Sequence, residues 1–379
     1  MKQNLWVLVW MCVLGPSASA AVAAAEILRV SNDHDSGPGS FRQALAEADT
    51  NSDVFVVRFD RDFTVKLRSS LSYRGNKPLT IDGGQAVIDG GNIGHGNILD
   101  IHSSAPVVLK NIKFINSRGN GVVVKIPDEA IGNVSVTLDG VEIKQSTLYG
   151  LHIDDNFHAK DEGDAGSAAG ILLNIYNSAF VDNGVGELDY DGIRVDERGA
   201  GDIIAHISDT QINHNGGDGL ELDEGGAGNV NLTMIHSELN NNGFFNESDL
   251  EDGLDIDEAG AGDVNVTLIG VHADGNHEQG IDLDEFDSGT IELTFSDVHS
   301  DDNVNEGIKV DEQHDGDILT FFSHVYVKNA GQEGIRIAQN GNGRVYSELH
   351  HVEFPDATYR AGLKDDDGVG KMLLAWLNR

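Results

Sequence analysis

Cysteine and positive charge are scarce in this sequence. The 379 residues contain one cysteine, and Lys and Arg number 25 against 63 Asp and Glu, which gives a net charge of −38. The shortage of positive charge argues against nucleic acids and anionic membrane surfaces as partners, because both attract basic proteins. The single cysteine, Cys12, lies in an N-terminal segment that we expect to be removed, so the mature chain is expected to have no disulfide.

Long hydrophobic runs are also missing after the first residues, so no transmembrane segment is expected. Residues 1–20 are typical of a secretory signal peptide. Lys2 supplies the positive start, an apolar stretch begins at Leu5, and the small residues Ala18–Ala20 precede the cleavage point. Cleavage after Ala25 is the alternative. We therefore expect an exported protein, in the periplasm, at the cell surface or outside the cell.

What the sequence does contain is seven copies of a short phrase, such as DGLDIDE from Asp252. Each copy has a glycine at its second position, and four of the six spacings between these glycines are 27 residues. A repeat of this length is typical of a solenoid, a propeller or an array. The glycines are Gly150, Gly192, Gly219, Gly253, Gly280, Gly307 and Gly334.

One repeat unit contains three short stretches of alternating polarity, separated by turn residues. In the copy that begins at Gly253, the residues expected to face inward are Leu254, Ile256, Val264, Val266, Leu268, Val271 and Ala273. Period-two alternation predicts half-buried strands. Three strands in about 27 residues fit one coil of a parallel β-helix, whereas a β-roll repeats about every nine residues and a propeller blade needs about 40.

The chain is expected to consist, after the signal peptide, of an N-terminal cap region at 26–70, a parallel β-helix at 71–360 and a C-terminal cap or tail at 361–379. Ser40 and Gln43 form a capping-box pattern that starts a short helix. Its apolar stripe is expected to seal the open end of the core, because terminal coils have an unpaired edge. The stripe consists of Phe41, Ala44, Leu45 and Ala48. The C-terminal MLLAWLNR either seals the other end or docks on a partner.

Three segments near the start, VSNDHDSGPGSFRQALAEA, VVRFD and LTIDGGQAVIDGGN, resemble the opening of many exported bacterial right-handed parallel β-helix repeat proteins. The resemblance spans roughly Ile27 to Val352 and implies a pectate-lyase-like fold. It implies no single activity, because this superfamily includes lyases, hydrolases, epimerases and adhesins. The ordered motifs of the polygalacturonase-like hydrolases and a transferable pectate-lyase signature are both missing from the sequence.

The repeat places acidic side chains in columns on one face of the expected β-helix. Alternate residues of a strand face outward, and parallel coils stack about 4.8 Å apart. The first column reads His152, Arg194, Glu221, Asp255, Asp282, Lys309 and Arg336. The second column reads Asp154, Asp196, Asp223, Asp257, Asp284 and Asp311. Beside it runs a third column of Asp155, Glu197, Glu224, Glu258, Glu285 and Glu312.

We expect calcium at the centre of this face, held by Glu221, Asp223, Asp255, Asp257, Asp282 and Asp284. Carboxylates about 5 Å apart repel each other by roughly 3 kcal/mol at an effective dielectric constant near 20, and calcium binds about six to eight oxygen ligands. The basic residues that bracket the face, and are candidates for ligand binding, are Arg194, Lys309 and Arg336. The alternative is a solvated acidic surface, adapted to salt or copied by duplication of the repeat.

Two further patterns recur along the repeat. Asn215, Asn276 and Asn303 each lie four residues before a repeat glycine and predict an internal ladder of side-chain amides at a turn. His272 and His299 are 27 residues apart and are expected to be neighbours on the outside, where a binding or catalytic role competes with simple exposure.

Two functions are compatible with these patterns. The first is a non-enzymatic, calcium-stabilised β-helix that presents its acidic face to a polysaccharide, a cell surface or a matrix component. The regular coils, with no lone catalytic group, favour it. The second is a polysaccharide lyase or epimerase acting with calcium on a uronate-containing glycan, in which a basic side chain takes the proton. The ligand, the mode of surface attachment and the oligomeric state stay open.

Overall fold

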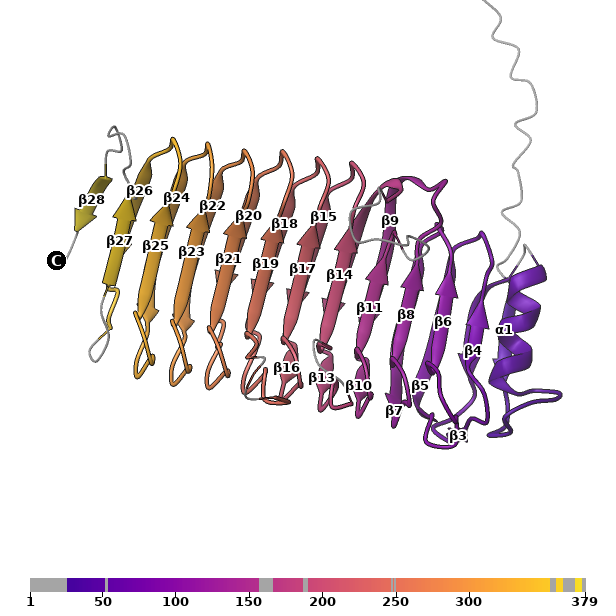
Figure 1. The fold of residues 1–379 in the computed structure, drawn as a ribbon. Helices are drawn as coiled ribbons and strands as arrows, with labels where there is room; N and C mark the ends of the chain where they lie inside the picture. The colour runs from indigo at the N-terminus through magenta and orange to yellow at the C-terminus, as the bar shows by residue number, and fades with distance from the viewer. Residues whose placement is uncertain are drawn as a thin grey trace, which may run out of the picture.

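The chain folds, in a computed structural model, into a stack of β-coils (Figure 1). The structure describes residues 26–51, 54–156, 166–186, 190–246, 248, 250–354, 359–363 and 372–376; the expected signal peptide lies outside them. The described residues form one α-helix and 28 strands in two sheets whose strands pair in parallel. The prediction of an all-β, right-handed parallel β-helix with an N-terminal helix is confirmed.

The smaller sheet contains 11 strands, which follow one another along the stack in sequence order, one in each coil (Figure 1). It carries the repeated phrase. Its strands are β4 (Leu71–Tyr73), β6 (Leu99–His102), β8 (Val122–Lys125), β11 (Leu151–Asp154), β14 (Ile193–Glu197), β17 (Leu220–Glu224), β19 (Leu254–Glu258), β21 (Ile281–Glu285), β23 (Ile308–Glu312), β25 (Ile335–Gln339) and β27 (Tyr359–Leu363).

The larger sheet contains 17 strands and wraps around the rest of each coil. Between its longer and shorter strands the chain bends at a residue with positive φ, such as Asp209 at 51° and Gly270 at 62°, a conformation that Asn, Asp and Gly adopt most readily. Its strands are β1 (Glu26–Val30), β2 (Val54–Phe59), β3 (Thr64–Lys66), β5 (Leu79–Asp89), β7 (Val107–Ile115), β9 (Ile131–Asp139), β10 (Glu142–Lys144), β12 (Ala168–Tyr176), β13 (Ala179–Val181), β15 (Ile203–Ser208), β16 (Gln211–Asn213), β18 (Val230–Ile235), β20 (Val264–Ile269), β22 (Ile291–His299), β24 (Ile318–Tyr326), β26 (Val345–His350) and β28 (Met372–Trp376).

The hydrophobic core runs through the middle of the stack. All seven side chains predicted to face inward in the coil from Gly253 are buried, each with 2% of its surface exposed or less. Burying one such branched side chain stabilises the fold by about 1.5–3 kcal/mol. The third stretch of this coil differs from the prediction, because it pairs only through two isolated bridges of His272, with Glu238 and His299, instead of a full strand.

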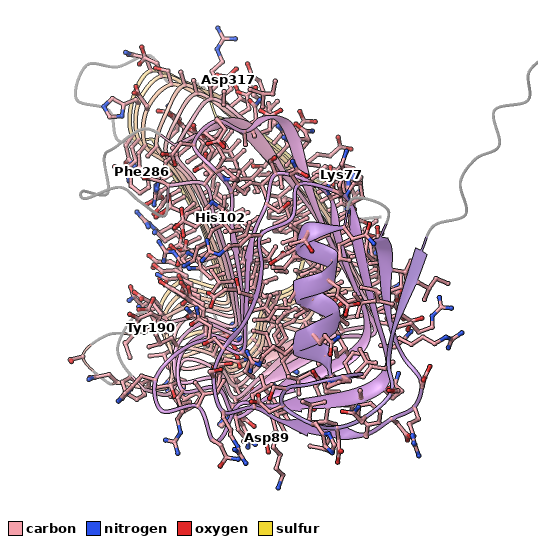
Figure 2. All side chains as sticks on the ribbon, turned by 90° about the vertical axis from the view of Figure 1, so that its right-hand side faces the viewer. Lys77, Asp89, His102, Tyr190, Phe286 and Asp317 are labelled. Carbon is pink, nitrogen blue, oxygen red and sulfur yellow. The ribbon has the colours of Figure 1, made fainter. Side chains whose placement is uncertain are left out.

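The N-terminal end of the core is sealed by α1 (Phe41–Thr50), which lies across the open end of the stack (Figure 2). The four residues of the predicted stripe are buried. The Ser40 hydroxyl accepts a hydrogen bond from the Gln43 amide at 3.2 Å, as a capping box requires. The reciprocal bond differs, because the Gln43 side chain donates to Glu47 at 2.6 Å instead of reaching back to the cap.

The predicted asparagine ladder is present inside one turn of successive coils. Asn215 donates a side-chain hydrogen bond to Asn242 at 3.0 Å, and Asn276 donates one to Asn303 at 3.1 Å. Asn183 and Asn242 also belong to the ladder. The sequence pattern misses these two, because insertions lengthen the segment between each of them and the next repeat glycine.

At the other end of the stack, β28 pairs with β26, so residues of the expected C-terminal cap extend the larger sheet. The described part of the chain contains no helix long and apolar enough to cross a membrane.

Candidate functional site

The strand register of the smaller sheet aligns the first and second columns as the sequence predicts. β14, β17, β19, β21, β23 and β25 pair without a shift. Arg194 pairs with Glu221, Glu221 with Asp255, and Asp255 with Asp282. Lys309 and Arg336 continue the column. Tyr190 and Phe286, which flank strands of this sheet, lie on the same side of the stack when it is viewed along its axis (Figure 2).

The third column points into the molecule instead of joining the outer face. Its six side chains and the following Gln339 are all 0% exposed. The Glu224 carboxylate accepts hydrogen bonds from the Gly226 and Gly228 amides at 3.0 and 3.1 Å, which closes the turn after the strand. Buried carboxylates with such partners are structural. The third column therefore holds turns together and offers nothing to an external ligand.

Repulsion between the acidic side chains of the third column is reduced because some of them stay protonated. Burial, with Glu285 and Glu224 on either side, raises the pKa of Glu258 to about 9. Burial and the neighbouring Glu224 and Asp155 raise the pKa of Glu197 to about 9 in the same way. At neutral pH every second glutamate can therefore donate a hydrogen bond along the column, as the Gln339 amide does to Glu312 at its end.

At the N-terminal end of the acidic face, two arginines neutralise the carboxylates. Arg194 donates to Asp196 at 2.9 Å and Asp223 at 3.2 Å, and contacts Glu221. Arg198 contacts Asp223 as well. Burial alone would raise the pKa of Asp196, but the hydrogen bond from His152 and the charge of Arg194 lower it to about 2. Asp196 is therefore ionised and paired, whereas burial raises the pKa of Asp223, and burial together with Asp191 raises the pKa of Glu221, despite their contacts with the arginines.

At the other end, Lys309 and Arg336 have the same role. The Lys309 ammonium lies 2.7 Å from Asp282 Oδ2 and 3.0 Å from Asp284 Oδ2. Arg336 lies 2.8 Å from Asp311. Burial would lower the pKa of Lys309, but the two aspartates raise it well above its usual range. Lys309 is therefore a fixed cation at neutral pH.

Between these two ends, β19 carries carboxylates that no cationic side chain of the described residues contacts. These are Asp255 and Asp257. Burial and the nearby Asp284 raise the pKa of Asp257 to about 7. Burial and the neighbouring Asp257, Asp282 and Asp284 raise the pKa of Asp255 well above its usual range. The centre of the face is thus short of positive charge, and in the absence of a cation it holds protons.

Three carboxylates at the centre lie close enough to one another to hold a metal ion together. Asp252, Asp255 and Asp282 each offer an oxygen, and these oxygens lie within 4.8 Å of one another. The Asp282 Oδ1 atom is buried and has no hydrogen-bond partner. Calcium prefers several carboxylate oxygens, supplemented by water or carbonyl groups. The residues at this position therefore fit a calcium ion.

A second cluster of three acids is contacted by a positively charged side chain of the protein itself. Asp191, Asp218 and Glu221 also bring their oxygens within 4.8 Å of one another. There the guanidinium of Arg194 contacts Glu221 and lies 3.8 Å from Asp191. Arg194 thus supplies beside Glu221 a positive charge that no described side chain supplies by contact with Asp255.

The expected calcium ligands thus fall into two groups. Glu221 and Asp223 lie against arginines, and Asp284 lies against Lys309. In contrast, Asp255, Asp257 and one oxygen of Asp282 have no cationic partner among the described residues.

The sequence analysis missed two residues of this site, Asp252 and Arg198. Asp252 could have been found as the residue before the repeat glycine, a position that is also aspartate in two other copies. Arg198 lies in a turn, outside any column.

Comparison with known proteins identifies the fold. No family model and no curated protein matches the sequence. The solved structure of pectate lyase Pel9A is similar, with a TM-score of 0.52 and 15% identity over 87% of this chain and 78% of that one. ORF18 of Geobacillus virus E2 gives a TM-score of 0.52 and 12% identity over 85% of this chain. This chain spans 62% of the phage protein's length. The protein therefore has a right-handed parallel β-helix fold, similar to those of these two structures.

Proposed function

We propose that this protein is an exported, calcium-dependent carbohydrate-binding β-helix. Asp252, Asp255 and Asp282 hold the cation at the centre of the acidic face. The observation that supports the proposal most is the difference within one face: both ends carry their own cations, whereas β19 carries acids that no described cation contacts. A bound calcium ion would neutralise these acids and offer its remaining coordination positions to sugar hydroxyl or carboxylate oxygens.

The residues around the cation site support a polymeric ligand. Arg194 and Lys309 lie in the same column on either side of it. A charge of −38 repels polyanions, so an acidic polysaccharide binds only where metal and basic side chains supply positive charge. Stacked coils about 4.8 Å apart present these groups as a linear array, which suits an extended chain at a cell surface or in a matrix.

A lyase or epimerase is the alternative, and the ion pairs give it less support. Proton abstraction needs a basic group that is deprotonated at the working pH. The two aspartates hold Lys309 in its charged form, and Arg336 pairs with Asp311. Lyase activity would show as a product absorbing at about 235 nm on incubation with pectate or alginate, because β-elimination forms a carbon–carbon double bond, whereas epimerase activity would show as a changed ratio of the two uronate epimers.

The proposal is tested by glycan binding with and without metal. The mature protein is applied to a panel of acidic and neutral polysaccharides in calcium, in magnesium and in chelator, at matched ionic strength. We expect retention by at least one acidic polysaccharide in calcium only, and loss of that retention in Asp255→Asn. Asp128→Asn, an exposed acid outside the face, is the matched control. Equal retention in calcium and chelator would contradict the proposal.

A further inference from the structure

The outer face of the larger sheet changes character near the C-terminal end of the stack, where β22, β24 and β26 lie (Figure 1). On β18 and β20, two outward columns consist of paired asparagines and paired threonines. On β24 and β26, the same columns continue as Leu319, Phe321 and Tyr346. Large apolar side chains thus interrupt a polar repeat on a surface that faces solvent.

Phe321 is the most unusual of these residues. Its side chain is 41% exposed, and it is the one aromatic among the exposed large hydrophobic residues that the structure describes. Its ring centroid lies 5.5 Å from that of His350. Tyr346 beside it is oriented by a hydrogen bond of 3.1 Å from Arg344 to its hydroxyl. Leu319, Phe321 and Tyr346 lie together on this surface, and a contiguous apolar patch of this kind is typical of a binding site.

These side chains surround a depression of about 290 Å³. This volume is close to the lower limit of small-molecule sites, about 300 Å³, and suits a short saccharide. The outward side chains that line it are Glu292, Thr294, Leu319, Phe321, Tyr346 and Glu348. An apolar floor therefore lies between two carboxylates and a hydroxyl group.

This combination matches the chemistry of an uncharged sugar ring. The C–H face of a pyranose packs on an aromatic side chain, as apolar groups do on Phe and Tyr, while its hydroxyl groups donate to carboxylates. The two glutamates repel uronates and sulfated sugars. Glu292 forms no ion pair in the described part of the chain, and Glu348 lies 2.8 Å from His350.

We propose that this depression binds neutral pyranose saccharides independently of calcium. It lies on the larger sheet, whereas the calcium-centred acidic face belongs to the smaller one. The inference does not depend on the proposed function, because no residue is shared between the two sites. A second copy of the chain is the competing occupant, and the net charge of −38 opposes that pairing.

The experiment is a titration of the mature protein with neutral oligosaccharides (gluco-, xylo-, manno- and galacto-series) in chelator, followed by calorimetry or ligand-observed NMR. We expect at least one series to bind and Phe321→Ala to weaken it about tenfold or more, equivalent to about 1.4 kcal/mol. Phe321→Tyr keeps the ring and should keep most of the affinity. Glu292→Gln keeps an acceptor oxygen but removes its charge, and it should weaken binding by about threefold.

Asn265→Ala, on the polar part of the same column, and Asp255→Asn, in the acidic face, are the matched controls and should bind as the wild type does. Three results would overturn the inference: no series binds at about 10 mM, Phe321→Ala binds equally well, or Phe321→Ala abolishes a dimer seen by sedimentation. Loss of binding in Asp255→Asn alone would count against this site and leave the calcium proposal untouched.

Discussion

Two coils of the same sheet solve the same electrostatic problem in opposite ways. In the coil of β14, Arg194 lies among the acids, and the pKa of Asp196 falls to about 2 against the opposing effect of burial. In the coil of β19, an aspartate takes the place of the arginine, and burial with Asp284 raises the pKa of Asp257 to about 7. The backbone register is the same in both coils.

The difference shows how the first-column residue affects its coil: Arg194, with His152, lowers the pKa of Asp196, whereas Asp255 in the same column adds a further buried acid. The repeat fixes the carboxylates in register, and each coil then needs a positive charge. Where the chain supplies that charge, the acids form a closed network. Where it does not, protons or a metal ion must take its place. Three substitutions and a change of pH test this difference between the two coils.

The largest effect is expected from Arg194→Gln, which removes the built-in cation. Its side chain is only 14% exposed, and breaking a buried ion pair by removing one partner costs about 3–5 kcal/mol. Urea unfolding should show that loss, and calcium should restore part of it because the coil then resembles that of β19. The control is Arg29→Gln, whose ion pair with Asp60 is exposed and contributes less than about 1 kcal/mol. Equal effects of the two substitutions would contradict the account.

Asp255→Asn should act in the opposite direction in the absence of metal. Removing one charge from the central cluster relieves repulsion of roughly 3 kcal/mol per neighbour at close range, reduced by the protons that the cluster already holds. We expect a gain of about 2 kcal/mol at pH 8 in chelator, measured by thermal unfolding. In calcium the order should reverse, with the wild type more stable. A variant that is less stable than the wild type in both conditions would argue against an uncompensated centre.

The stability of the metal-free protein should fall as the pH rises. Burial and Asp284 raise the pKa of both Asp257 and Asp282 to about 7, from an ordinary value of 3.8. The folded state therefore binds more protons than the unfolded state from about pH 4 upward, and stability is lost through pH 7. Because Asp257 and Asp282 interact and titrate as a pair, we count one extra proton between them, and unfolding at pH 5 and pH 8 in chelator should differ by about 2–3 kcal/mol. Calcium should reduce the difference, because it replaces the protons. A flat profile in chelator would refute this description of the centre.

The smallest effect is expected from Glu258→Gln in the third column. Burial and its neighbours raise the pKa of Glu258 from 4.5 to about 9, so the wild type should lose stability as the pH rises between these two values, whereas the amide does not titrate. We expect the stability of the variant relative to the wild type to rise by about 1 kcal/mol between pH 5 and pH 6, and the rise to level off above pH 9. The exposed Glu129→Gln should show no such pH dependence. A large loss at pH 6 would mean that an amide cannot replace the protonated acid.

The sequence predicts the fold and the register of this site well, because both follow from geometry. A 27-residue repeat with period-two alternation leaves the first and second columns no other alignment. The same alternation that turns Leu254 and Ile256 inward also turns Glu258 inward. The expectation that the third column lies on the acidic face was therefore wrong, because it rested on the charge of these residues and not on their inward position in the strand.

The rest of the site depends on contacts that the repeat does not encode. Arg198 reaches Asp223 from a turn, so no column contains it. Asp252 approaches Asp255 and Asp282 because the chain enters the strand beside them. The two acids of β19 that no described basic side chain contacts can be identified only after each Lys and Arg has been assigned to the carboxylates that it contacts.

The most direct test of the central claim is calcium titration of the mature protein by calorimetry after removal of bound metal, for the wild type and Asp255→Asn. We expect a site specific for calcium over magnesium, release of protons on binding near pH 7, and loss of the site in the variant. Failure of the wild type to bind calcium at millimolar concentration, or unchanged binding in Asp255→Asn, would contradict it.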